Sequence, residues 1–470
     1  MLRYFKSFYT IIFVTLIFGY NPPKKAEPIN IPYEKFELSN GLDVILHEDH
    51  SIPMVSVNMW YHVGSKNEKP GRTGFAHLFE HLMFEGSKHH NYNFTQPLEE
   101  VGGNDNGSTS TDRTNYWTNV PSDQLELALW LESDRMGFLL DVMTQDKLDN
   151  QRDIVKNEKR QNYDNKPYGR AWAIIPEMMF PSDHPYHWIP IGSMEDLSAA
   201  SLDDVSDFFK KYYIPNNASL CIAGDIDIEE TKKLVEKYFS SIPSGNPVDR
   251  LESQAVSLDG TSRKTIYDNV SAGMLIYGWH SPALYSKGDA ELDHLANILT
   301  ESKVSRLYKS LVYEQQLAQE VEAFQWSREI GSTFHIMVTA KEGHSLEEIE
   351  EALNKELQEI VKMGISHKEL EQSKTQWEAR FIRGLEQIGG FGGKADILNG
   401  YNVMLGDPGK FNWDLNRYMD VTINDVRNAT SKYIDMDNKV ILKILPSEDV
   451  SSTNDSFDRN KKPKAGDKTL

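Results

Sequence analysis

The order of apolar and polar positions predicts a chain that mixes β-strands with amphipathic helices. Apolar runs at 36–38 and 42–46 flank an Asn40-Gly41 pair, which is typical of a β-hairpin turn. Residues 54–62 predict a further strand. Apolar residues at helical spacing predict helices over 75–84, 125–136 and 147–161. Because strands come in adjacent pairs followed by helices, the pattern favours an α+β fold over a Rossmann-type alternation.

One pattern repeats along the chain at a constant offset. Asp204, Lys211 and Asn217 recur 221 positions later as Asp425, Lys432 and Asn438. In both copies a helical segment runs into a turn and then an apolar run that predicts a strand. A sustained offset indicates an internal duplication into two homologous halves. The alternative is a chance match between two common helix-to-strand junctions.

The chain divides into five segments. Residues 1–28 place basic residues before a short apolar run, which is the order of a secretory signal, and the run is shorter than the roughly 20 residues of a membrane span. An uncleaved signal anchor is the alternative. Residues 29–242 and 265–447 are the two predicted halves, joined by a turn-rich linker at 243–264. The polar tail at 448–470 is predicted to be disordered.

The amino-acid composition excludes several classes of protein. Hydrophobic residues make up 39% of the 470 residues, which is enough for sizeable cores. The chain has 50 Lys and Arg against 70 Asp and Glu, a net charge of −20, so a general nucleic-acid binder is excluded. The single cysteine, Cys221, excludes a disulfide framework and is predicted to be buried. An exported chain without disulfides fits a bacterial periplasm.

The segment 75–84 carries the most informative chemistry. Each residue of an α-helix turns by about 100°, so His77, Glu80 and His81 share one face. Two neutral imidazoles at i and i+4 can hold one Zn²⁺, and the nearby carboxylate can then reach a water molecule without being a ligand itself. The alternative is a pair of ordinary helix histidines with satisfied hydrogen bonds.

A catalytic zinc site needs a third protein ligand, and Glu158 is the candidate. Helical rotation places Glu158 between Ile154 and Val155, on the predicted apolar face of its helix. A carboxylate there is costly to bury unless it is paired or bound to metal. From this geometry alone, an ion pair with Arg152 or Lys156 is an equally good interpretation.

The segment 74–87, GFAHLFEHLMFEGS, resembles the inverted zinc motif H-x-x-E-H of the pitrilysin/insulinase-type (inverzincin) metallopeptidases. In that family the third ligand is a Glu that follows the motif after 76 residues, and 76 residues separate His81 from Glu158. The resemblance implies that His77, His81 and Glu158 bind Zn²⁺ and that Glu80 is the general base. It also implies two homologous mixed halves of the LuxS/processing-peptidase-like metallohydrolase fold.

A second segment is similar to the family's substrate-binding edge strand. Asn106, Gly107 and Ser108 follow a glycine pair, and the resemblance implies that they hold a peptide as an added strand. Gly107 stands where alanine is usual. The alternative for this stretch is a polar surface hairpin.

Two departures from the family pattern bear on activity. The family usually has a second Glu seven residues before the ligand Glu, and here that position is Gln151, which cannot supply the extra negative charge. Family second halves often carry an Arg and a Tyr that steady the substrate carbonyl. Here those positions hold Val312 and Gln319, while Arg306 and Tyr308 are near but are not equivalent.

The second half also lacks the metal motif. Asp293, Ala296 and Asn297 stand where His77, Glu80 and His81 stand in the first half, so the second half is predicted to be inactive.

These observations predict a zinc-dependent endopeptidase that hydrolyses peptides or unfolded polypeptides. The missing Arg/Tyr pair favours the zinc-carrying subunit of a heterodimer whose homologous partner supplies that pair. Two alternatives remain: a catalytically idle binding or assembly subunit that keeps the fold, and a maturation peptidase acting on one specific partner. The expected location is the periplasm, without a stable membrane span unless the signal is uncleaved.

Overall fold

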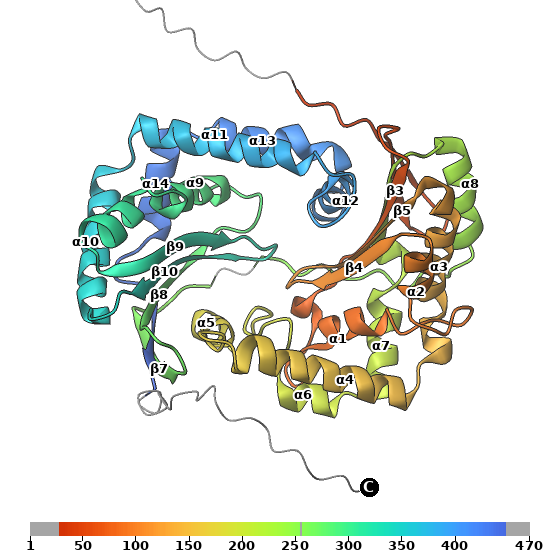
Figure 1. Cartoon of the computed structure of the whole chain (residues 1–470), viewed down its shortest axis with the longest axis horizontal. Helices are drawn as coiled ribbons and strands as arrows, with labels where there is room; N and C mark the ends of the chain where they lie inside the picture. The colour runs from red at the N-terminus through yellow and green to blue at the C-terminus, as the bar shows by residue number, and fades with distance from the viewer. Residues whose placement is uncertain (1–27, 254–255, 448–470) are drawn as a thin grey trace, which may run out of the picture. The chain divides into compact units, whose positions relative to one another are not determined.

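A computed structural model describes residues 28–253 and 256–447 (Figure 1). The predicted signal at 1–28 lies almost wholly outside these residues, and the predicted tail at 448–470 lies wholly outside them. Within the described ranges, no helix combines the length and the apolar character needed to cross a bilayer.

The first half contains six strands and eight α-helices among the described residues. They are β1 (Glu34–Glu37), β2 (Asp43–Glu48), β3 (Met54–Tyr61), α1 (Phe75–Leu82), α2 (Gln96–Glu100), β4 (Asn104–Thr109), β5 (Thr114–Pro121), α3 (Leu125–Phe138), α4 (Gln145–Lys159), α5 (Ala171–Met179), α6 (Met194–Ala199), α7 (Leu202–Tyr212), β6 (Ala218–Gly224) and α8 (Ile228–Phe239). The hairpin, the third strand and the three helices predicted from the sequence are present, with boundaries shifted by about two residues.

The second half follows as β7 (Ser262–Asp268), β8 (Met274–Ser281), α9 (Asp289–Thr300), β9 (Ala318–Trp326), β10 (Ser332–Ala340), α10 (Leu346–Met363), α11 (His367–Gly384), α12 (Lys394–Leu405), α13 (Phe411–Met419), α14 (Ile423–Tyr433) and β11 (Val440–Pro446). Strand β7 begins inside the segment that the sequence assigned to the linker.

The two sheets share one topology. The first has the order β1-β2-β6-β3-β5-β4 and the second has the order β7-β11-β8-β10-β9. In each, one parallel pair (β2 with β6, β7 with β11) is followed by three antiparallel pairs. Helices α7 and α14 precede equivalent strands, and both begin with a capping box, at Ser201 and Thr422. The duplication predicted from the constant offset is therefore confirmed.

Each half buries one face of its sheet under its own helices. In the first half α1, α3, α7 and α8 pack with the sheet into a large apolar core, and in the second half α9, α10 and α14 do the same (Figure 1). Cys221 is a buried free thiol on β6, as predicted.

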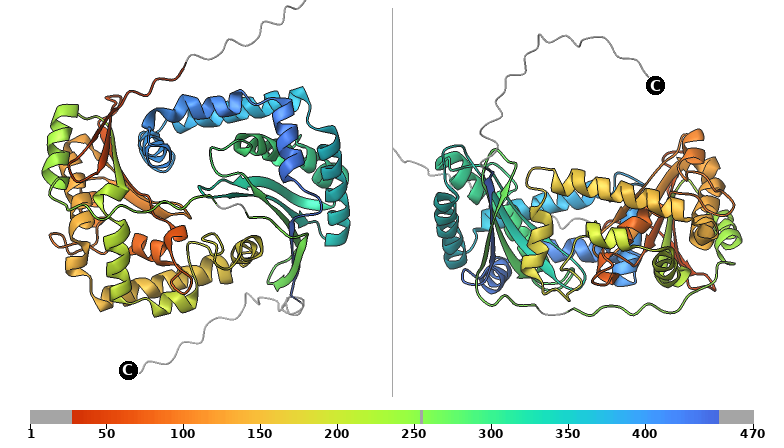
Figure 2. Two further views of the ribbon diagram at one scale, coloured as in Figure 1. Left: turned by 180° about the vertical axis from the view of Figure 1, so that it is seen from behind. Right: turned by 90° about the horizontal axis from the view of Figure 1, so that it is seen from below.

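The opposite faces are covered by an exchange of helices between the halves (Figures 1 and 2). Helix α12 of the second half places Ala395 and Leu398 on Ile45 and Cys221 of the first sheet. Helix α5 of the first half packs on the second sheet, where its buried side chains meet those of β8 and β11. Each half therefore completes the other, and the sheets are tied together through two apolar contacts.

Asp396, near the start of α12, adds a polar contact to this exchange. Its Oδ1 accepts hydrogen bonds from Trp60 Nε1 at 2.8 Å, from Asn115 Nδ2 at 2.8 Å and from Asn58 Nδ2 at 3.2 Å. Asn58 and Asn115 are fully buried. Removal of the carboxylate would leave their donors without a partner, and each orphaned donor costs about 1–3 kcal/mol.

We therefore expect Asp396→Ala to lower the free energy of unfolding by about 3 kcal/mol in urea titrations. Glu229→Ala is the matched control, because Glu229 is exposed and forms an ion pair with Lys232 at 2.7 Å; its effect should stay below about 1 kcal/mol. Equal unfolding midpoints for the two variants would contradict the assigned role of Asp396.

Candidate metal centre

Helix α1 is fixed at its first turn by groups that hold its N-terminus. Gly74 precedes the helix at φ +89°, and a Cβ atom there would lie 2.8 Å from the carbonyl oxygen of Ile191. The Glu68 carboxyl accepts hydrogen bonds from the backbone N–H groups of Gly74 at 3.0 Å and Ala76 at 2.8 Å. Burial raises the pKa of Glu68 to about 8. Sequence reasoning missed Glu68, whose only signal is an acidic residue shortly before the helix.

The structure brings the three predicted ligand residues together. His77 and His81 project from α1, and Glu158 projects from the last turn of α4. The distance to Glu158 Oε2 is 3.5 Å from His77 Nε2 and 3.4 Å from His81 Nε2. Ligand atoms of all three residues lie within 4.8 Å of one another, and no other such group occurs among the described residues.

This spacing fits a tetrahedral metal ion. Zinc binds imidazole nitrogen and carboxylate oxygen at about 2.0–2.2 Å, so two ligand atoms of one tetrahedron lie about 3.3 Å apart. The two observed nitrogen-to-oxygen distances are close to that edge. Two imidazoles and one carboxylate also form the three-ligand set of catalytic zinc sites, which leaves a fourth position for water or substrate.

The pKa shifts of His77 and Glu158 suit metal binding, whereas the raised pKa of His81 favours its protonated form, which has to lose its proton before it can bind a metal. Burial, with the neighbouring His81, lowers the pKa of His77 to about 4, so this imidazole is neutral at pH 7. Burial also acts to lower the pKa of His81, but its hydrogen bond with Glu158 and the charges of Glu80 and Glu158 outweigh burial and raise it. The hydrogen bond from His81 lowers the pKa of Glu158, which therefore stays ionised.

The surroundings of Glu158 differ from the sequence interpretation in two respects. Ile154 is 42% exposed, so Glu158 lies at the edge of the buried face and not within it. Arg152 and Lys156, the ion-pair partners considered from the sequence, do not pair with Glu158. Arg152 donates to Asp149 and to the Ala200 carbonyl, and Lys156 lies 4.0 Å from the exposed Asp153. The ionic partners of Glu158 within the described chain are the two histidines.

Glu80 lies beside the ligand set on the same helix. Its Oε2 is buried without a hydrogen-bond partner among the described residues, and burial raises its pKa. Together with His77 and Glu158 it lines a pocket of about 630 Å³. A carboxylate that lines a pocket and keeps one oxygen without a protein partner can accept a proton from a molecule bound there.

Gln151 connects the site to a further carboxylate. Its side chain is 5% exposed, its Nε2 donates to Glu85 Oε1, and the amide helps to raise the pKa of His81. The family usually has a carboxylate, and so a negative charge, at position 151. Here the carboxylate on that side is Glu85, which is linked to His81 through Gln151. Gln151 acts as a neutral connector between His81 and that charge.

This arrangement predicts the effect of restoring the family residue. Gln151→Glu would put two carboxylates in contact, so we expect it to destabilise the zinc-free protein by about 1 kcal/mol or more at pH 7 and to bring no gain in zinc affinity. Adding Glu85→Gln should recover the stability. A double-mutant cycle in urea, with zinc affinity measured by competition, checks this; additive effects would show that the two positions are independent.

The predicted substrate segment forms β4, at one edge of the first sheet. Gly107 and Ser108 line the same pocket as Glu80, whereas Asn106 is exposed and its Oδ1 accepts the N–H of Gly107 at 2.8 Å. A Cβ atom on Gly107 would lie 3.1 Å from Glu80 Cγ. Glycine here gives Glu80 more room than the usual alanine would.

The residues at the two usual Arg and Tyr positions cannot replace that pair as donors to the substrate carbonyl. Val312 and Gln319 do not line the metal pocket, and Arg306 is held by both oxygens of Glu369 at 2.5 and 2.7 Å. One arginine of the second half does line the pocket, namely Arg328 in the turn between β9 and β10. Sequence reasoning missed it, because it lies 16 positions beyond Val312 and matches no motif.

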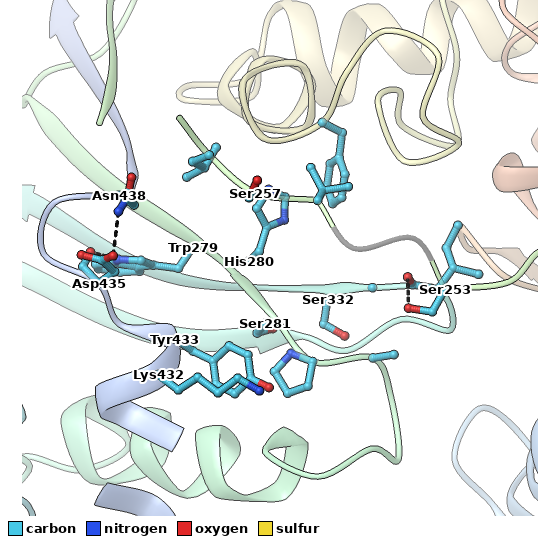
Figure 3. A pocket seen from close by; sticks show the side chains of 17 residues that line it. Ser253, Ser257, Trp279, His280, Ser281, Ser332, Lys432, Tyr433, Asp435 and Asn438 are labelled. Atoms are coloured by element: carbon cyan, nitrogen blue, oxygen red, sulfur yellow. Dashed lines mark hydrogen bonds between the residues drawn. The ribbon is translucent and has the colours of Figure 1, made fainter. Parts of the chain in front are cut away.

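Another pocket, of about 410 Å³, lies on the second sheet beside the linker (Figure 3). Two of its polar contacts are internal: Asn438 Nδ2 donates to Asp435 at 2.7 Å, and Ser253 Oγ donates to the Ile330 carbonyl at 2.9 Å. His280 Nε2 and Ser281 Oγ are buried without a hydrogen-bond partner among the described residues. It holds none of the predicted site residues and is not the candidate site.

Comparisons with known proteins identify the family of the chain. A family model described as insulinase (peptidase family M16) matches residues 43–179, and one described as peptidase M16 inactive domain matches residues 199–377. The two models together cover more than half of the chain. The first match contains the motif helix and Glu158, and the second runs from the last part of the first half into the second half.

Two relatives that cover most of the chain are named zinc proteases. The chain is 28% identical to zinc protease PqqE of Helicobacter pylori over 85% of this chain and 90% of the relative. It is 24% identical to the uncharacterized zinc protease YmxG of Bacillus subtilis over 79% and 90% of the two chains.

Solved structures share the fold. The crystal structure of a protease from Helicobacter pylori has a TM-score of 0.81 at 27% identity and covers 89% of this chain and all of that one. The periplasmic protease PqqL from Escherichia coli has a TM-score of 0.72 at 18% identity, over 91% and 49% of the two chains. The duplicated fold, the motif helix and these matches lead to one conclusion: the chain belongs to the insulinase (M16) family of peptidases.

Proposed function

We propose that the chain is a zinc endopeptidase in which His77, His81 and Glu158 hold Zn²⁺ and Glu80 is the general base. The observation that carries the proposal is the convergence of the three ligand side chains, with nitrogen-to-oxygen distances of 3.4 and 3.5 Å. Beside them lies Glu80, whose Oε2 is buried without a hydrogen-bond partner in the described part of the chain.

The residues divide the chemistry between them. Zinc, when bound, would polarise the peptide carbonyl and make water more acidic. Glu80 would take the proton from the attacking water and pass it to the leaving amine, because it lines the pocket and its Oε2 has no hydrogen-bond partner among the described residues. Asn106, Gly107 and Ser108 would hold the substrate backbone along β4, because an edge strand can pair with an extended peptide.

The substrate carbonyl needs a further donor, and this supports a heterodimer. Val312 and Gln319 leave the usual Arg/Tyr positions without a charge or a hydroxyl group, and neither residue lines the pocket. A homologous partner chain with the Arg/Tyr pair would supply that donor. The same substitutions also support the second candidate, an idle binding or assembly subunit that keeps the fold.

Zinc content and cleavage of a quenched mixed-peptide library, measured on the purified chain, test the proposal. Zinc with chelator-sensitive cleavage would support a self-sufficient peptidase and would contradict the need for a partner. Zinc without cleavage would favour the heterodimer. Absence of zinc after equilibration with the metal would contradict the proposed ligand set.

We also propose that the protein is exported to the periplasm, on the basis of the basic-then-apolar order at the N-terminus. Fractionation of cells that carry the tagged full chain, with N-terminal sequencing of the product, tests this and shows whether the signal is cleaved.

A further inference from the structure

The metal pocket contains a buried arginine that the proposed chemistry does not use. Arg328 is 8% exposed and lies in the turn between β9 and β10, so it reaches the pocket from the second half. Its guanidinium donates one hydrogen bond within the described chain, from Nη2 to Thr333 Oγ1 at 3.3 Å, and its Nε is buried without a partner. Most of its five N–H groups are therefore unused.

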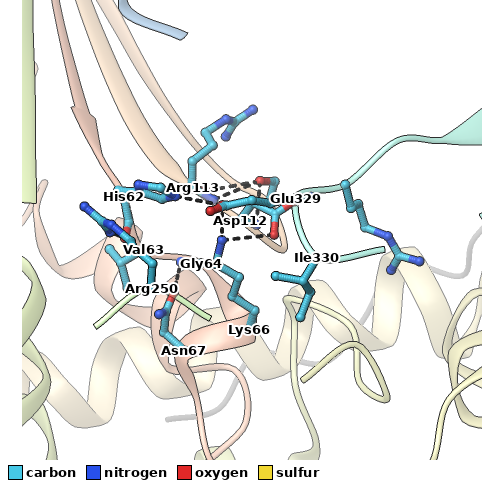
Figure 4. Close-up of polar contacts among 12 residues, drawn as sticks. His62, Val63, Gly64, Lys66, Asn67, Asp112, Arg113, Arg250, Glu329 and Ile330 are labelled. Atoms are coloured by element: carbon cyan, nitrogen blue, oxygen red, sulfur yellow. Dashed lines mark hydrogen bonds and ion pairs between the residues drawn. The ribbon is translucent and has the colours of Figure 1, made fainter. Parts of the chain in front are cut away.

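The nearby carboxylates are already committed to other cations (Figure 4). Glu329, the next residue, is bonded by His62 Nε2 at 2.7 Å and by Lys66 Nζ. Asp112 pairs with Lys66 at 3.2 Å and accepts hydrogen bonds from Tyr186 OH at 2.6 Å and the Glu329 backbone N–H at 3.0 Å. Arg328 consequently forms no ion pair among the described residues.

The aromatic neighbours of Arg328 keep it in place without neutralising it. Its guanidinium carbon lies 4.3 Å from the ring centroid of Tyr186, 5.1 Å from that of Phe180 and 5.7 Å from that of Trp326. Cation–π contacts of this kind offset only part of the free-energy cost of burying an unpaired charge. Burial accordingly lowers the pKa of Arg328. An anion that entered the pocket would remove this cost.

The lining of the pocket indicates what kind of anion fits. Trp172 and Trp326 line the pocket beside Arg328, and their ring centroids lie 5.7 Å apart in an edge-to-face arrangement. The two rings offer apolar walls to the carbon atoms of a ligand. A planar guanidinium binds a planar carboxylate through two parallel hydrogen bonds. The carboxylates that line the pocket, Glu80 and Glu158, belong to the metal centre and are not among the contacts of Arg328.

We propose that Arg328 selects the substrate by binding a peptide carboxylate, either an acidic side chain or the C-terminal carboxylate, while the peptide occupies the metal centre. This inference rests on the proposed peptidase function. Arg328 would thus be a specificity residue that the second half contributes to the site of the first half.

Binding without turnover gives the direct test. Zinc-loaded full-length Glu80→Gln protein would be titrated with one neutral peptide, with variants that carry a single Glu at each position in turn, and with C-terminal acid and amide forms, and tryptophan fluorescence would report the Kd. We expect at least one acidic form to bind about tenfold or more tightly than its neutral counterpart. A preference confined to the acid over the amide terminus would identify the C-terminal carboxylate as the ligand.

Substitutions then assign that preference to Arg328. Arg328→Gln should reduce the acidic-to-neutral affinity ratio to about one, and Arg328→Lys should keep part of it. Arg250→Gln is the control, because Arg250 is an exposed arginine near Glu329 that does not line the metal pocket; its ratio should match that of the unsubstituted protein.

The outcomes separate this inference from the proposed function. Equal affinity for acidic and neutral peptides before any change at Arg328 would overturn the inference, and this result does not depend on whether the arginine variants fold. Equal weakening of all peptides by Arg328→Gln would show a structural role only, which also overturns it. Failure of every peptide to bind the zinc-loaded protein would count against the proposed function as well.

Discussion

Replacing Glu80 by glutamine is expected to reduce peptide hydrolysis by about 10²–10⁴-fold while leaving zinc content unchanged. Glutamine has nearly the same shape, so it can keep the contact with Gly107 and the site beside His81. It cannot take a proton from water, and the structure offers no other buried acceptor with a free oxygen in the lining of this pocket among the described residues. The measurement is kcat/KM on a quenched peptide, with metal analysis of the same preparation.

Glu100→Gln provides the matched control, because Glu100 is an exposed carboxylate on α2, where its Oε1 accepts a hydrogen bond from Gln96 at 3.1 Å. Its activity should stay within about twofold of the original protein. Hydrolysis by Glu80→Gln at the original rate would show that Glu80 is not the base. Loss of zinc from Glu80→Gln would indicate instead that Glu80 is a metal ligand.

The parts of the fold and the site that could be predicted are those whose signals are local or have a fixed spacing. His77, Glu80 and His81 share a helix face by rotation alone, and the structure places them so. The distance in sequence to Glu158 identified the third residue, although the helical argument for its burial was only half right, because Ile154 is exposed. The duplication could be predicted from the sequence because both halves contain a capped helix followed by a strand, and these elements have similar residues at a constant offset.

The parts that could not be predicted depend on contacts between segments far apart in the chain. The exchange of α5 and α12 leaves no periodic signal, because an amphipathic helix does not indicate which sheet it covers. Position 151 has no carboxylate, but the Gln151 side chain is hydrogen-bonded to the carboxylate of Glu85. The spacing of residues in the sequence does not show this contact. The unpaired state of Arg328 is visible only after Asp112 and Glu329 are seen to be bonded to other groups.

Replacing Glu158 by glutamine is expected to weaken zinc binding by about 100-fold or more. Residues that hydrogen-bond to zinc ligands without touching the metal are worth about 10–100-fold in metal affinity, and a direct ligand should exceed that range. The amide oxygen is neutral, so it would replace the carboxylate that faces both imidazoles at 3.4 and 3.5 Å with a weaker donor. Asp153→Asn is the control on the same helix, because Asp153 is 78% exposed and lies 4.0 Å from Lys156.

Thermal unfolding separates loss of the ligand from loss of the fold. Zinc at about 1,000 times its Kd stabilises a protein that binds it only when folded by about 4 kcal/mol, so zinc should raise the Tm of the original protein and of Asp153→Asn equally. In Glu158→Gln the zinc-dependent rise in Tm should largely disappear, while the Tm of the zinc-free protein should change little because Glu158 is one-third exposed. A full zinc-dependent rise, with unchanged zinc stoichiometry, would remove Glu158 from the ligand set and leave the two histidines in need of a different third partner.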